Sequence, residues 1–170
     1  MKRFFGVVVC MVALLLAVSA SAQDEPKFES PAKMTLQNFP GLPQCLKAAA
    51  TKGDPTKEAA VIYAKLTAGC KVPMHWHTAA EQLMMVSGAA RMEHQGGQPE
   101  MLSKGSYALL PSKHQHNFAC SGPCEFYIVT DGAFDIHYVD ASGNEIQPEQ
   151  ALSSTKSAKS ATKSKGKAAK

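Results

Sequence analysis

The most informative part of the chain reads GCKVPMHWHTAAEQLMMVSG and covers residues 69–88. His75 and His77 lie two residues apart, so both imidazoles point to one side of an extended strand. Glu81 follows four residues later, which leaves enough chain for a bend that brings its carboxylate to the same side. Two neutral imidazoles and a carboxylate form a donor set that suits Fe, Mn, Ni, Cu or Zn. This stretch therefore predicts a metal site that needs at least one further ligand.

A second stretch supplies candidates for that ligand. Residues 105–117 read GSYALLPSKHQHN and contain another pair of histidines, His114 and His116, again two residues apart. Any one of these histidines alone is explained as a residue of the core. Two such pairs in one chain, with a glutamate close to the first, favour a metal site.

Both stretches resemble the motifs of one protein family, the cupin superfamily. The first motif, G-x5-H-x-H-x3-E-x6-G, is matched at every fixed position by Gly69, His75, His77, Glu81 and Gly88. The second motif, G-x5-P-x-G-x2-H, is matched by Gly105, Pro111 and His116. It departs at Lys113, which stands where the motif has a glycine that eases a turn. The resemblance implies that the metal ligands are His75, His77, Glu81 and His116.

The resemblance also implies a range of activities, because cupins with this ligand set include dioxygenases, decarboxylases and isomerases. A manganese decarboxylase usually needs a second acid near the metal, and none is evident in the sequence. Our first hypothesis is therefore a metal-dependent, dioxygenase-type oxidoreductase that acts on a small organic molecule. The alternative is a non-catalytic cupin module that binds a metal or a ligand, since a fold does not settle a function. Fe or Mn is the expected metal, with Ni, Cu and Zn as further candidates, and the resemblance implies a homodimer.

His114 is the candidate catalytic residue. It lies two residues before His116, so it should face the same interior if one strand carries both. An imidazole titrates near neutral pH and can act as a general base. The alternative is a solvated histidine at the mouth of the barrel.

The rest of the chain predicts an all-β protein. Short apolar segments separated by Gly and Pro turns, without a long helical period, are typical of an antiparallel barrel or jelly roll. Strands are expected at 60–66, 81–86, 89–94, 99–102, 106–110, 115–119, 125–130 and 134–139, with an edge strand near 33–37 and a helical turn over 45–50. The expected fold is a single cupin barrel (a double-stranded β-helix or jelly roll) over 58–140, with an N-terminal arm over 23–57 and a C-terminal extension over 141–152.

Residues 1–22 have the pattern of a secretory signal peptide. Lys2 and Arg3 precede an apolar run that ends in an A-x-A cleavage site at 20–22. The run has only about 12 to 15 residues, fewer than the ~20 that cross a bilayer. We therefore expect export to the periplasm or the extracellular space without a membrane span.

Charge is concentrated at the two ends of the chain. Lys and Arg number 18 and Asp and Glu number 14, and two basic residues fall in 1–22 and six lysines in 153–170. This leaves 10 basic and 14 acidic residues in 23–152, a net charge of −4, which argues against nucleic-acid binding. The Lys-rich tail over 153–170 contains almost no apolar residue beyond alanine and is expected to be disordered. It either keeps the protein soluble or holds it near anionic polymers and lipids of the cell envelope.

Four cysteines follow the predicted leader: Cys45, Cys70, Cys120 and Cys124. An even number in an exported chain suggests disulfides, for which three connectivities are open. Cys120 and Cys124 flank a Gly-Pro turn that could bring their thiols within bridging distance, and Cys45 would then pair with Cys70. The alternatives are a redox-active cysteine pair and a thiolate metal site. Three residues separate Cys120 from Cys124, which is not the usual spacing of a redox pair, and the four cysteines are too scattered for a zinc ribbon.

Overall fold

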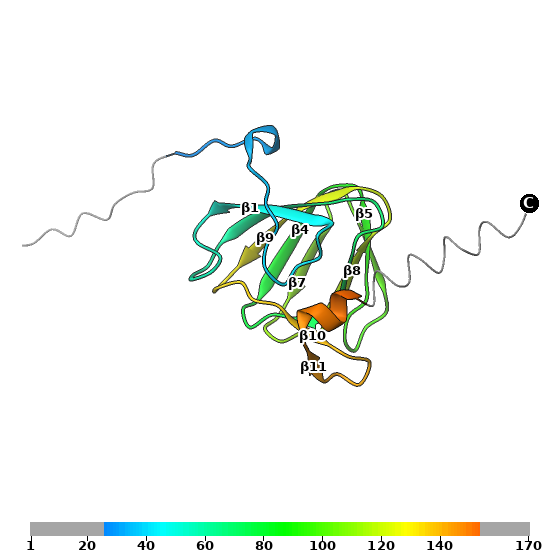
Figure 1. Cartoon of the computed structure of the whole chain (residues 1–170). Helices are drawn as coiled ribbons and strands as arrows, with labels where there is room; N and C mark the ends of the chain where they lie inside the picture. The colour runs from blue at the N-terminus through cyan, green and yellow to red at the C-terminus, as the bar shows by residue number, and fades with distance from the viewer. Residues whose placement is uncertain (1–25, 154–170) are drawn as a thin grey trace, which may run out of the picture.

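The structure, a computed structural model, describes residues 26–153 and contains two antiparallel β-sheets (Figure 1). The five-stranded sheet has the order β1-β2-β9-β4-β7, with β1 (Leu46–Lys52), β2 (Val61–Leu66), β9 (Cys124–Thr130), β4 (Glu81–Ser87) and β7 (Tyr107–Leu110). The six-stranded sheet has the order β11-β10-β3-β8-β5-β6, with β11 (Glu145–Ile146), β10 (His137–Val139), β3 (Lys71–Trp76), β8 (His116–Cys120), β5 (Ala89–Met92) and β6 (Glu100–Ser103). The predicted all-β class is confirmed.

Helical structure is confined, within residues 26–153, to the short 3-10 helix η1 (Pro31–Lys33) and a helix that begins at residue 148. In this part of the chain neither is long and apolar enough to cross a membrane. The predicted leader over 1–22, and the predicted tail beyond its first residue, lie outside the described residues.

The core forms because each strand turns one row of side chains inward. In β9 every second residue is buried, and β4 buries Leu83 and Met85 on the same face. Successive side chains of a strand point to opposite faces, so apolar residues two apart collect on one side. Phe118 of β8 and Phe126 of β9 meet between the sheets, with ring centroids 4.8 Å apart. The two sheets therefore pack face to face around one apolar interior.

The prediction of a helical turn over 45–50 is wrong. All of this stretch except Cys45 belongs to β1, in which Leu46 lies opposite Leu66 of β2. Alanine favours a helix by intrinsic propensity, but pairing with β2 and the burial of Leu46 and Ala48 determine the conformation. Part of the segment 23–57 thus forms one edge of the five-stranded sheet.

Several strands are shorter than predicted, and the strand expected over 89–94 ends at Met92. The edge strand expected near 33–37 is reduced to a single bridge between Gln37 and Ala48. The strand expected over 134–139 covers only His137–Val139. The residues before it form a loop whose polar groups bind the turn between β3 and β4.

Two disulfides tie the ends of strands together. They join Cys45 to Cys70 and Cys120 to Cys124, with Cα–Cα distances of 5.7 Å and 6.1 Å. The pairing that the sequence favoured is confirmed. The first disulfide fixes the start of β1 to the turn before β3, and the second closes the turn between β8 and β9.

Removing the two disulfides should destabilise the protein unequally. The sequence separations are 25 and 4 residues, and the entropy that a cross-link removes from the unfolded chain grows with the loop it closes. The Cys45→Ala/Cys70→Ala variant should lose about 3.5 kcal/mol of unfolding free energy, and the Cys120→Ala/Cys124→Ala variant about 2 kcal/mol. Denaturant unfolding of both under identical conditions measures the difference. Equal losses, or a larger loss in the second variant, would contradict this account.

Candidate metal centre

Four polar side chains meet inside the otherwise apolar barrel: His75, His77, Glu81 and His116, here called the four metal-site residues. His75 lies near the end of β3, and His116 begins the neighbouring strand β8, where the two are paired across the sheet. His77 follows β3, and Glu81 begins β4 in the other sheet. Each of the four is at most 5% exposed. The structure therefore brings together all the residues that the sequence predicted as ligands.

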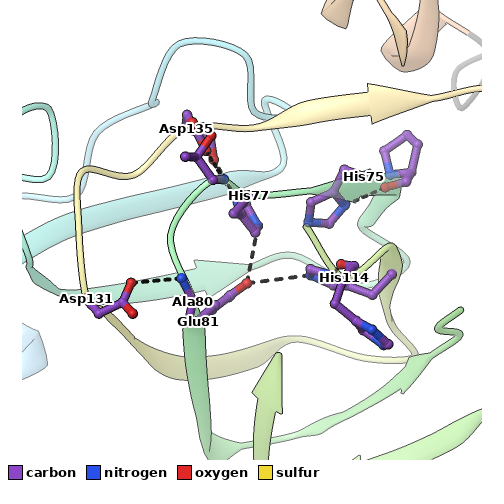
Figure 2. A network of polar contacts seen from close by, with 10 residues as sticks. His75, His77, Ala80, Glu81, His114, Asp131 and Asp135 are labelled. Carbon is purple, nitrogen blue, oxygen red and sulfur yellow. Dashed lines mark hydrogen bonds and ion pairs between the residues drawn. The ribbon is translucent and has the colours of Figure 1, made fainter. Parts of the chain in front are cut away.

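The distances among these side chains suit a metal ion. Ligand nitrogens of the three imidazoles all lie within 4.8 Å of one another, a grouping that could hold a metal. Glu81 Oε2 lies 3.2 Å from His77 Nε2 (Figure 2) and 3.5 Å from His116 Nε2. This oxygen is buried and accepts no hydrogen bond, which is uncommon for a buried carboxylate. A cation between the carboxylate and the imidazoles would satisfy it, so the residues fit a divalent transition metal.

Backbone carbonyls orient all three imidazoles. Nδ1 of His75 lies 2.7 Å from the carbonyl oxygen of Pro73. Nδ1 of His116 lies 3.0 Å from the carbonyl oxygen of His114. Nδ1 of His77 contacts the carbonyl oxygen of Asp135. A carbonyl oxygen only accepts hydrogen bonds, so each Nδ1 must carry the proton and donate it. The lone pair is then on Nε2, and in His77 and His116 this atom faces Glu81. This is the tautomer in which Nε2 binds a metal while Nδ1–H is held by an outer partner.

Burial and mutual proximity shift the pKa values of the site. Burial, with the neighbouring His116 and His77, holds the pKa of His75 well below its usual value, so this imidazole is neutral. Burial favours a raised pKa for Glu81, but the facing imidazoles of His116 and His77 outweigh it and hold the pKa below its usual range. Burial likewise lowers the pKa of His77, and the Glu81 carboxylate outweighs that effect and raises it. Glu81 is therefore ionised, the form in which a carboxylate binds a metal.

A cavity of about 40 Å³ adjoins the four metal-site residues. Its other walls are apolar: Phe39, Leu42, Leu46, Ala48, Ile62, Ala64, Val72, Leu83, Phe118, Phe126, Ile128, Phe134 and Ile136. One water molecule needs about 10–15 Å³ on this measure, so the space holds roughly three waters. Apolar walls also weaken dielectric screening and strengthen any interaction with a charge inside. The arrangement can hold an ion and a few additional ligand atoms in a dry environment.

Two aspartates to which the sequence assigned no role at the metal site hold the bend before Glu81. The N–H of Thr78 donates to Asp135 Oδ1 at 2.8 Å, and the N–H of Ala80 donates to Asp131 Oδ1 at 2.8 Å (Figure 2). Both aspartates lie in the loop between β9 and β10. They satisfy two backbone donors of the bend and so fix the position from which Glu81 enters the interior. In the sequence, Asp131 and Asp135 are visible only as two acidic residues shortly after an apolar strand. Their role becomes clear once β9 is known to pair with β4, because this pairing places the loop after β9 beside the bend before Glu81.

Lys113, the one departure from the second motif, adopts the backbone conformation of the glycine it replaces. Its φ is +62°, and it is the only non-glycine residue with positive φ within residues 26–153. Its N–H donates to the carbonyl of His77 at 2.8 Å, so the conformation serves a contact beside the metal-site residues. For an L-residue this left-handed conformation costs roughly 1–2 kcal/mol. The departure leaves His116 in the predicted register.

The structure does not bring the side chain of His114 to the metal-site residues. Its Nε2 lies 3.3 Å from Nδ1 of His94, and its side chain is not among the walls of the cavity. Burial and the nearby His94 lower the pKa of His114. The expected alternation with His116 does not hold because β8 begins only at His116. The catalytic role of His114 stays a prediction.

Comparisons with known proteins agree with this fold. Residues 62–130 match the family model described as "Cupin domain". The chain is similar in structure to the polyketide cyclase RemF from Streptomyces resistomycificus, with 14% identity, 68% of this chain and 87% of that chain covered, and a TM-score of 0.59. It is also similar to an RmlC-like cupin from Shewanella frigidimarina, with 16% identity, 64% and 93% coverage, and a TM-score of 0.54.

A further similarity is to the DMSP lyase DddQ from Ruegeria pomeroyi, with 19% identity over 61% of this chain and a TM-score of 0.48. The chain spans about half of that lyase, 52% of its length. A comparison with curated proteins finds no match. At these identities the structural likeness shows a shared fold alone.

The matched domain, the two-sheet barrel and the two motifs agree with one another. Residues 62–130 are therefore a cupin domain, and residues 26–153 have the cupin fold.

Restoring the motif glycine should stabilise the protein. Lys113→Gly removes the strain of holding a residue with a side chain at positive φ. It also removes a weak cation–π contact, because the Lys113 ammonium lies 5.8 Å from the centroid of the Trp76 ring. The relief of about 1–2 kcal/mol exceeds the roughly 0.4–1 kcal/mol by which a glycine favours the unfolded chain, so we expect the unfolding free energy to rise by no more than about 0.5 kcal/mol. Lys104→Gly is the matched control, because that exposed lysine has an ordinary φ and its replacement should destabilise. Thermal unfolding that shows both variants equally destabilised would contradict the strain argument.

Proposed function

We propose that this protein is a metal-binding cupin whose four metal-site residues hold one divalent transition metal, Fe or Mn first, with Ni, Cu and Zn as further candidates. One observation carries the proposal. Three buried imidazoles donate Nδ1–H to backbone carbonyls and keep their Nε2 lone pairs around a buried carboxylate oxygen that accepts no hydrogen bond. A polar cluster with a purely structural role would be expected to satisfy its own hydrogen bonds.

Each of the four residues has a separate task in this proposal. His75 and His116 face each other on paired strands and would fix two ligand directions rigidly. Glu81 supplies the negative charge that lowers the cost of burying a divalent cation. His77 lies on the bend after β3 and is oriented through Asp135. Four protein ligands leave two positions of an octahedral ion for small ligands, where the metal supplies Lewis-acid or redox chemistry.

We further propose a dioxygenase-type oxidoreductase that acts on a small organic molecule. Glu81 is the only carboxylate among the walls of this cavity, so an acid-assisted decarboxylation lacks the second acid it usually needs. Glu81 is also the carboxylate placed to move a proton at the site, since the side chain of His114 lies outside the cavity walls.

A second candidate function, metal binding without turnover, is favoured by the size of the cavity. The space beside the metal-site residues is about 40 Å³, enough for roughly three waters but not for a bulky substrate. A coordinatively filled metal at this position would act as a bound ion or a ligand anchor. Oxygen consumption by the metal-loaded protein with small candidate substrates, absent from the His116→Ala variant, distinguishes catalysis from binding alone.

We also propose export to the periplasm or the extracellular space. Two disulfides support an oxidising compartment, and the leader pattern over 1–22 supports secretion. The six lysines of the tail support association with an anionic cell envelope. A homodimer is part of the proposal, and the exposed Tyr107 and Leu109 on β7, an edge strand of the five-stranded sheet, support it.

Elemental analysis of the exported protein, purified without chelator, should find close to one transition metal per chain. His116→Ala removes one nitrogen ligand and Glu81→Gln removes the charge, so both variants should retain at least about tenfold less metal. His94→Ala is the matched control, because His94 is a half-buried histidine outside the metal-site residues and should leave the metal content unchanged.

Two results would defeat the assignment. One is a wild-type protein that carries no metal and takes none up on reconstitution. The other is equal metal loss in His116→Ala and His94→Ala, which would place the ion at another site.

A further inference from the structure

A histidine outside the metal-site residues lies between two carboxylates. His137 Nε2 is 3.2 Å from Asp135 Oδ2, and its Nδ1 is 2.7 Å from Glu145 Oε1. An ionised carboxylate only accepts hydrogen bonds, so both ring nitrogens must carry hydrogen for both contacts to form. An imidazole with hydrogen on both nitrogens is an imidazolium cation.

The same ring lies flat on the only tryptophan of the chain. The His137 and Trp76 rings are stacked with centroids 3.9 Å apart and an interplanar angle of 5°. A cation over an indole face is attracted by the ring quadrupole, so the stacking also favours the charged imidazole. The charged groups facing His137 are Asp135 and Glu145, while the Lys113 ammonium approaches the Trp76 ring, 5.8 Å from its centroid.

Asp135 connects this ring to the metal-site residues by two contacts. Its carboxylate Oδ1 accepts a hydrogen bond from Thr78 N at 2.8 Å, and its backbone carbonyl accepts one from His77 Nδ1. Figure 2 shows Asp135 above His77, with a dashed line between them. Whatever holds the Asp135 side chain therefore also holds the carbonyl that orients His77.

We propose that His137 is a positioning residue: as an imidazolium it ties Asp135 to Glu145 and Trp76 and thereby fixes the orientation of His77. The group Asp135, His137, Glu145 and Trp76 is called the His137 clamp. Its effect on the metal rests on the proposed function, whereas the clamp itself does not. His137 contacts none of the four metal-site residues directly and acts on His77 through Asp135. It is therefore not a catalytic residue.

The clamp should depend on pH in one direction. Burial favours a lowered pKa for His137, but Glu145 and Asp135 outweigh it and raise the pKa above that of a free histidine. The stabilisation is then complete below pH ~6.5 and is lost as pH rises through the raised value. The side chains of His137, Asp135 and Glu145 are 29%, 37% and 57% exposed, so solvent screens the charges and the shift is modest.

Trp76 reports the charge of His137 directly. A charged imidazole stacked on an indole quenches its fluorescence by accepting an electron from the excited ring. In the metal-free wild-type protein, fluorescence should rise with pH through a midpoint above ~6.5. Glu145→Gln should move that midpoint down by roughly half a pH unit, and His137→Gln should abolish the transition.

Zinc affinity, measured by competition with a chelating dye, tests the link to His77. His137→Gln should weaken zinc binding about tenfold, the lower end of what outer partners of a metal ligand contribute. His137→Arg is the rescue variant, since a guanidinium keeps a cation between the carboxylates and on the indole face. It should restore zinc affinity to within about twofold of the wild type while still lacking the fluorescence transition.

The fluorescence titration and the zinc affinities test different parts of the proposal. An unchanged midpoint in His137→Gln would overturn the clamp. A correct fluorescence result with equal zinc affinity in wild type and His137→Gln would overturn the positioning role. Equal weakening in His137→Gln and His137→Arg would also overturn it, because the cation would then be irrelevant. A wild-type protein that binds no zinc or other metal would defeat the proposed function, and the fluorescence titration would still decide on the clamp.

Discussion

Burial of three imidazoles and a carboxylate in an apolar barrel is the constraint on which the rest of this structure depends. Unpaired polar groups in such an interior are strongly unfavourable, so each must find a partner. The imidazoles find theirs in backbone carbonyls on the Nδ1 side. The Nε2 side and the buried oxygen of Glu81 then face one another without enough donors to satisfy every acceptor. A divalent cation resolves that deficit, which is why we regard the cluster as a metal site and not as a polar defect of the core.

The barrel supplies this arrangement from both sheets. His75 and His116 come from paired strands of one sheet, and Glu81 starts a strand of the other. The bend that joins them is held from outside by the loop between β9 and β10, through Asp131 and Asp135. The site is thus rigid where strands carry it and dependent on one loop where the chain crosses between sheets. His137, the first residue of β10, directly follows that loop and lies outside the cavity walls.

Much of the site could be predicted because strand alternation is a local rule. Spacings of two residues place side chains on one face, which grouped His75 with His77. The full set of four metal-site residues followed from the resemblance to the cupin motifs, and the all-β class followed from short apolar segments between Gly and Pro turns. β1 could not be predicted, because its alanines form a strand only through pairing with β2. The loop aspartates could not be predicted either, since their partners lie 51 and 57 residues away in the chain. His114 shows the limit of the local rule, which fails where a strand has not yet begun.

In the proposed metal site, Nε2 of the three histidines and the carboxylate of Glu81 bind one metal ion. Anomalous diffraction from crystals of the metal-loaded protein, collected on both sides of the absorption edge of that metal, tests it most directly. We predict one strong peak inside the barrel, about 2.0–2.3 Å from the three Nε2 atoms and from a Glu81 oxygen. No peak there, or a peak bound through Nδ1 by rings that have turned over, would contradict it.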